Sequence, residues 1–170
     1  MVKPIVVFHA RNVIPYYPQF EAEAIKDGAR FIEAEHMLLA LAAAAETGAG
    51  RLLIESGLDH DRLAAALRNE QRQSLAFAGI QAPAVRRGEA TEPDRDVSMG
   101  TSAKAALMRA LHASHRERPR RRRLQGIDLL VGVLGAELGT VPRALAIAGV
   151  DRAALIARAR AAGSETATRC

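Results

Sequence analysis

The sequence contains almost no cysteine, the residue whose disulfides stabilise many small exported domains. Its 170 residues include a single cysteine, Cys170, and one cysteine cannot form an internal disulfide. Disulfides form in oxidising compartments, so the cysteine content gives no indication of export. Tryptophan is absent and aromatic residues make up only 4% of the chain. The core must therefore be built mainly from aliphatic side chains.

Long hydrophobic runs are also absent. No window reaches the roughly 18 apolar residues without charge that indicate a membrane-spanning helix. The short apolar run after Lys3 is interrupted by Arg11 and Pro15, which does not fit a signal peptide. The sequence therefore predicts a cytoplasmic protein that has no membrane partner.

The motifs of several enzyme classes are missing as well. There is no Gly-x-x-x-x-Gly-Lys-Ser/Thr phosphate loop and no Gly-x-Ser-x-Gly nucleophile turn. Ser98, Ser102 and His112 form no recognisable nucleophile arrangement. His112 and His115 are three residues apart and can share one face of a helix, but no third metal ligand lies nearby. We therefore predict a non-enzymatic protein with no catalytic residues, no cofactor and no metal site, and interpret both histidines as solvated surface residues.

Helix-forming residues dominate what is present. Hydrophobic residues make up 49% of the chain, and alanine and leucine, both strong helix formers, supply most of them. The clearest cluster of β-branched residues is Ile5-Val6-Val7, followed by Phe8; this segment fits either a short strand or an apolar strip over the core. The composition predicts an all-α fold.

An internal repeat organises the chain. The segment 32–41 aligns with 124–133 at an offset of 92 residues. The same offset, without a gap, aligns three further pairs: Leu53 with Leu145, Gly57 with Gly149, and Asp59 with Asp151. Because one such unit buries little alone, the two copies are expected to pack as one pseudo-two-fold tandem repeat.

Each copy is predicted to contain four short helices, about eight in all. The expected ranges are 18–26, 34–46, 49–56 and 60–73 in repeat one, and 102–114, 126–138, 141–148 and 151–162 in repeat two. Pro18 suits the first turn of a helix. Gly57 and Gly149 suit left-handed caps at helix ends. Asp59, Asp151 and Ser102 suit amino-terminal caps. The expected organisation is an amino-terminal extension (1–17), repeat one (18–90), a polar linker (91–101), repeat two (102–162) and a flexible tail (163–170).

The repeated motif resembles a known family. Residues 32–41 read Ile-x-x-Glu-His-apolar-Leu-Leu-Ala-Leu, and residues 52–59 place Gly-apolar-Asp after a helix. This pattern resembles the amino-terminal domain of Clp-type ATP-dependent unfoldases, from about Phe20 to Arg160. The spacing from His36 to Gly57 recurs from Asp128 to Gly149. The resemblance implies a bundle of about eight helices that receives substrates and adaptor proteins and performs no chemistry.

The family resemblance also implies partners and a site. In the unfoldases this domain sits on an AAA+ motor, and the 170 residues contain no motor motif. The resemblance thus implies a stand-alone protein- or peptide-binding module: an adaptor, decoy or regulator whose partners are Clp substrates, adaptors or Clp subunits. In some relatives the glutamate before the motif histidine binds the guanidinium of phosphorylated arginine. Repeat one has Glu35 and His36 here, whereas repeat two has Ile127 and Asp128.

Two interpretations of Glu35 and His36 follow. The resemblance makes them the candidate ligand-binding residues, and it places the site in repeat one. The residues by themselves also allow a structural interpretation, in which Glu35 stabilises the positive end of its helix and His36 forms a hydrogen bond between helices. Loss of the glutamate in repeat two argues against paired phosphoarginine recognition.

A cluster of arginines gives the alternative function. The net charge is +5, and six arginines between 116 and 123 account for more than all of it. Arg120, Arg121, Arg122 and Arg123 are candidates to contact an acidic protein or the phosphates of a nucleic acid, and a solvated loop is the third interpretation. No aromatic residues alternate with the arginines, so a stacking platform for single strands is not supported. A small basic nucleic-acid-binding regulator is therefore the alternative.

Overall fold

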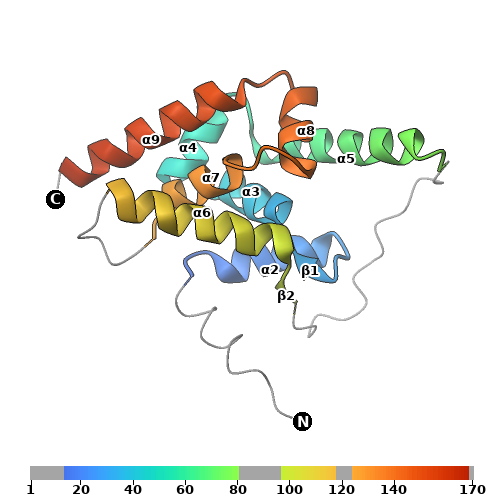
Figure 1. Ribbon diagram of the computed structural model, residues 1–170, viewed down its shortest axis with the longest axis horizontal. Coiled ribbons are helices and arrows are strands. Elements are labelled where there is room, and N and C mark those ends of the chain that lie inside the picture. The colour runs from blue at the N-terminus through green and yellow to red at the C-terminus, as the bar shows by residue number, and fades with distance from the viewer. Residues whose placement is uncertain (1–13, 81–96, 118–123, 169–170) are drawn as a thin grey trace, which may run out of the picture.

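The structure is a computed structural model that describes residues 14–80, 97–117 and 124–168. This described part contains eight helices and two short strands (Figure 1). Repeat one contributes α2 (Tyr17–Lys26), β1 (Phe31–Ile32), α3 (Ala34–Ala43), α4 (Gly48–Glu55) and α5 (His60–Phe77). β2 (Ser98–Met99) lies in the segment predicted as the linker. Repeat two contributes α6 (Thr101–Glu117), α7 (Gly126–Leu134), α8 (Thr140–Ile147) and α9 (Arg152–Thr168). The predicted all-α class, with four helices in each repeat, is confirmed.

The last helix of each repeat contacts the other repeat. α5 of repeat one packs on α8 of repeat two, and α9 of repeat two reaches back to α4 of repeat one. One ion pair lies across each contact, from Arg143 to Glu70 at 2.6 Å and from Arg158 to Glu55 at 3.3 Å. The buried apolar residues of both repeats form one continuous cluster. The repeats therefore share a core instead of folding as two separate units.

The glycine and aspartate caps predicted from the repeat are present in both copies. Gly57 and Gly149 have φ angles of 71° and 72°, the left-handed conformation that glycine tolerates best. The carboxylate of Asp59 accepts the backbone N–H of Arg62 at 2.8 Å. Asp151 accepts two backbone N–H groups of α9 in the same way.

Several helix ends differ from the prediction. α3 stops at Ala43 because the Thr47 hydroxyl donates to the Ala44 carbonyl at 2.8 Å and accepts from the next helix, which forms a turn. α7 stops at Leu134, where the Arg152 guanidinium binds the free carbonyls. α5 continues to Phe77, and α9 continues to Thr168, so residues 163–168, expected in the flexible tail, are helical.

The two strands were not predicted. β1 and β2 pair in parallel, with Phe31 opposite Ser98 and Ile32 opposite Met99. Each strand lies just before a helix, so this pairing brings the amino-terminal ends of α3 and α6 together. The strand considered for residues 5–8, like the linker residues 91–96, lies outside the described residues.

Within the described ranges, no single helix is long and apolar enough to cross a membrane. α3 and α4 reach the necessary length and apolar composition only when they are taken together, and the two helices are bent by 90° relative to each other. Nearly all of α3 is buried, which accounts for its apolar composition.

Candidate ligand-binding site at the start of helix α3

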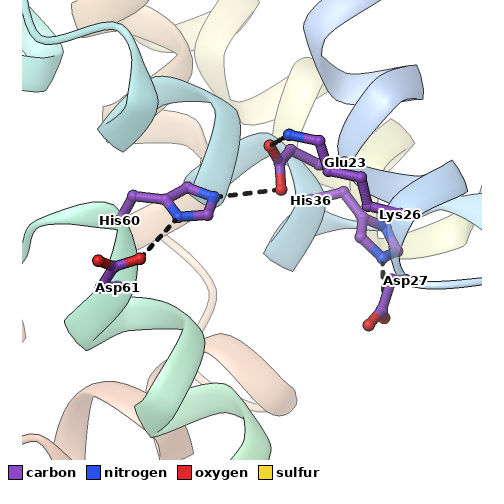
Figure 2. Close-up of polar contacts among 6 residues, drawn as sticks. All are labelled: Glu23, Lys26, Asp27, His36, His60 and Asp61. Carbon is purple, nitrogen blue, oxygen red and sulfur yellow. Dashed lines mark hydrogen bonds and ion pairs between the residues drawn. The ribbon is translucent and has the colours of Figure 1, made fainter. Parts of the chain in front are cut away.

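The first turn of α3 is closed by a reciprocal pair of caps. The Glu33 side chain accepts the backbone N–H of His36, and Nδ1 of His36 accepts the backbone N–H of Glu33 at 2.9 Å. Because Nδ1 acts as the acceptor, the ring proton belongs on Nε2, which faces the Asp27 carboxylate at 3.4 Å (Figure 2). His36 is buried and both of its ring nitrogens are engaged. The geometry gives this side chain a structural role.

Repeat two builds the same cap with a different residue. The backbone N–H of Gln125 donates to Asp128 Oδ2 at 2.8 Å, and the Gln125 side chain accepts the N–H of Asp128 in return. Asp128 therefore does in α7 what His36 does in α3, since either side chain presents an acceptor at the third helical position. The sequence contains the signal for this cap, because Gln125 at the cap position is followed three residues later by Asp128, whose side chain is an acceptor.

Glu33 also caps the neighbouring repeat. Its carboxylate accepts the backbone N–H of Ser102 at 3.0 Å and the Ser102 hydroxyl as well. The Ser102 hydroxyl accepts the Ala34 N–H at 2.8 Å, so each repeat caps a helix of the other. Ser102 was expected to cap its own helix, but α6 begins one residue earlier. Gly100 is needed beside this contact, because a Cβ there would collide with the Glu33 carboxylate.

Glu35 lies in the same first turn but makes no such contacts. Its side chain is half-buried, and burial raises the pKa of the Glu35 carboxyl, with smaller contributions from the negative charges of Glu33 and Asp27. Its own backbone N–H and His36 oppose this pKa shift. Within the described residues, no cationic side chain forms an ion pair with Glu35. The equivalent residue in repeat two, Ile127, is buried, so the two helix starts differ chemically.

Glu23 on α2 offers a direct contrast (Figure 2). This carboxylate is also buried, but it accepts hydrogen bonds from Lys26 Nζ at 2.8 Å and from His60 Nε2 at 3.2 Å. Burial alone would raise the pKa of Glu23, and the hydrogen bonds from Lys26 and His60 outweigh it, so the pKa is lowered. The Glu23 carboxylate thus has cationic hydrogen-bond donors within the fold, whereas the Glu35 carboxylate has none among the described residues.

The remaining candidates stay apart. His112 and His115 are both exposed on α6, and no group of three His, Cys, Asp or Glu side chains in the described segments is arranged to hold a metal ion. Ser102 and His112 are ten residues apart on one helix, or about 15 Å, which is too far for a catalytic pair. Arg120 to Arg123 lie outside the described residues.

Solved structures share this arrangement of helices. The N-terminal domain of the caseinolytic-protease-associated chaperone ClpD from Arabidopsis thaliana is 18% identical to this chain, with a TM-score of 0.61. The match covers 94% of this chain and 97% of that domain. A protein solved in preliminary structural investigations of a malarial protein secretion system is also 18% identical, with a TM-score of 0.58 and coverage of 91% and 89%.

No protein-family model matches the sequence, and no curated protein matches it either. The identities to the solved structures are low, so the likeness lies in the fold. The chain has the fold of the Clp amino-terminal domain, as its two repeats predicted.

Proposed function

We propose that this chain is a protein- or peptide-binding module, related to the receiving domain of Clp unfoldases, whose repeat one binds a cationic group through Glu35. The observation that carries the proposal is the state of Glu35: a half-buried carboxylate with a raised pKa and no cationic partner in the described chain. A polar group that burial destabilises is expected to gain a partner when a ligand arrives.

Guanidinium and ammonium groups fit this carboxylate. A hydrogen bond between ionised partners is roughly twice as strong as a neutral one, and an arginine side chain can make two in parallel. Glu23 illustrates the effect inside the fold, because Lys26 and His60 together lower its pKa despite its burial. A bound arginine or lysine would do the same for Glu35.

His36 acts as a positioning residue in this proposal. Its ring accepts a hydrogen bond that closes the first turn of α3, and Glu33 links that turn to α6. Both residues hold Glu35 at a fixed place instead of contacting the ligand. Repeat two keeps the cap but has an isoleucine at the contact position, so one cationic site is expected for each chain.

The partners that fit are Clp substrates, adaptors or Clp subunits. The proposed role is that of an adaptor, decoy or regulator of Clp-dependent proteolysis, and the fold shared with the ClpD N-terminal domain supports it. The module is proposed to bind without catalysing a reaction. Affinity capture from the host lysate should enrich Clp subunits, their substrates or their adaptors.

A pair of peptides tests the site directly. An arginine-containing peptide and its citrulline counterpart have nearly the same shape but differ in charge, and each is titrated into the ¹⁵N-labelled full chain. We expect the arginine peptide to shift the resonances of the first turn of α3 and to bind at least about tenfold more tightly. Glu35→Gln should abolish that preference, whereas Glu46→Gln, at an exposed carboxylate beyond the end of α3, should preserve it. Equal binding of both peptides by the wild-type chain would refute the proposal.

A further inference from the structure

α6 buries its small residues and exposes its large ones. Ala103, Ala106 and Ala110 are fully buried on its inner side. They face α7, where Gly132 approaches so closely that a Cβ would collide with the Ala106 carbonyl oxygen. Arg109 Nε also donates to the Gly132 carbonyl at 2.8 Å. The short distance between these two backbones leaves room for nothing larger than alanine at positions 106 and 110.

The outer side of α6 carries larger apolar residues. Met108 and Leu111 are 51% and 40% exposed, and residues three apart are neighbours on one helix face. A surface helix normally places polar residues there and its large apolar residues inside. In Figure 1 α6 crosses in front of α7, with its long axis along the surface of the molecule.

The charges around this apolar centre have one sign. Lys104 precedes it, and Arg116 follows it, both exposed. His112 and His115 lie exposed between the apolar pair and Arg116. From 101 to 116, α6 carries no acidic side chain. Along residues 101–116 of α6, the apolar centre is therefore flanked by basic and imidazole groups.

We propose that this surface, the α6 face, docks an acidic amphipathic helix from a partner protein. Two apolar residues of that helix would cover Met108 and Leu111, and its carboxylates would meet the basic groups at both ends. The α6 face is formed by six residues: Lys104, Met108, Leu111, His112, His115 and Arg116.

Charge and apolar area together favour a protein helix. Nucleic-acid phosphates would use the basic groups but would leave Met108 and Leu111 exposed. An anionic membrane favours aromatic anchors, and α6 has none. The proposal does not depend on Glu35, because it concerns different residues on a different helix.

The test uses synthetic helical peptides of about 15 residues, titrated into the ¹⁵N-labelled full chain. One peptide has two leucines on one face with glutamates around them, and a second has lysines in place of the glutamates. We expect the glutamate peptide to shift resonances of residues 104–116 and the lysine peptide to bind at least about tenfold more weakly. The double variant Met108→Ser/Leu111→Ser should weaken the glutamate peptide about tenfold.

Phe77→Ser is the matched control. Phe77 is 97% exposed near the end of α5, which projects from the body in Figure 1, so its loss removes more apolar surface at another place. Binding of the glutamate peptide should be unchanged in this variant. The proposal is overturned if the peptide shifts resonances elsewhere, or if Phe77→Ser weakens it as much as the double variant. Duplex DNA and phosphatidylserine vesicles are tested in the same way. The proposal is also overturned if either of them binds more tightly than the glutamate peptide and binds the wild type and the double variant equally well.

Discussion

Replacing Glu33 by alanine would test how the two repeats are held together. The carboxylate accepts the His36 N–H within α3 and both the N–H and the hydroxyl of Ser102 in the other repeat. Removing it takes the carboxylate acceptor away from the His36 N–H in α3 and from the Ser102 N–H in α6. The variant therefore combines the loss of a local cap with the loss of a contact between residues 69 positions apart in the chain.

The expected magnitude follows from these contacts. Loss of an amino-terminal cap costs about 0.5–2 kcal/mol, and a hydrogen bond to a charged group contributes about 1.5–3 kcal/mol. Glu33 is half-buried, so water can partly replace the carboxylate at the exposed donors. We expect Glu33→Ala to lower the free energy of unfolding by roughly 2–4 kcal/mol. The matched change in repeat two, Gln125→Ala, removes only a local cap and should cost about 1 kcal/mol.

Urea denaturation of both variants measures the difference. The free energy of unfolding is extrapolated from the transition midpoint and slope. Gly100→Ala supplies a second route to the same contact, because the added methyl would displace the Glu33 carboxylate. Its cost should therefore shrink in a Glu33→Ala background, as a double-mutant cycle would record. If Glu33→Ala costs no more than Gln125→Ala, the interpretation of Glu33 as the link between the repeats is wrong.

Four further predictions follow. Burial raises the pKa of Glu35, so its ionised form opposes folding; Glu35→Gln should stabilise the free protein at neutral pH, with a gain that disappears as the pH falls through the raised pKa. The pKa of Glu23 is lowered, so Glu23→Gln should destabilise the protein above the ordinary carboxyl pKa, and acid titration should remove the difference as the pH falls through the lowered pKa. His36→Asp should retain most of the stability, because Asp128 performs the same capping, while His36→Ala should cost about 1 kcal/mol in urea denaturation. For the alternative function, DNA or RNA binding should weaken steeply with salt and be lost when Arg120–Arg123 become alanine; no binding at low salt would eliminate it.

The local features were predictable from the sequence. The 92-residue offset located both repeats, and the glycine and aspartate caps at 57–59 and 149–151 depend on backbone conformations that neighbouring residues set. The helix ends were less predictable. α7 stops at Leu134 because Arg152, 18 residues away, binds its carbonyls, and no local signal indicates that contact.

The candidate site was predictable only in part. The motif singled out Glu35 and His36, and the residues left a ligand-binding and a structural interpretation open for both. The geometry separates them, since His36 is engaged on both ring nitrogens and Glu35 has no cationic partner among the described residues. The replacement of His36 by Asp128 in repeat two looked like the loss of a site residue, whereas it conserves a cap.

Residue types within a few positions of one another account for the existence of the helices, the glycine and aspartate caps and the difference between the two repeats. Tertiary structure decided which side chains are buried and which helices meet. Glu33 reaches Ser102 because the paired strands bring the starts of α3 and α6 together. α6 buries alanines and exposes Met108 and Leu111 because Gly132 lets the backbones of α6 and α7 approach closely. Hydrophobicity alone would have predicted the opposite orientation of this helix.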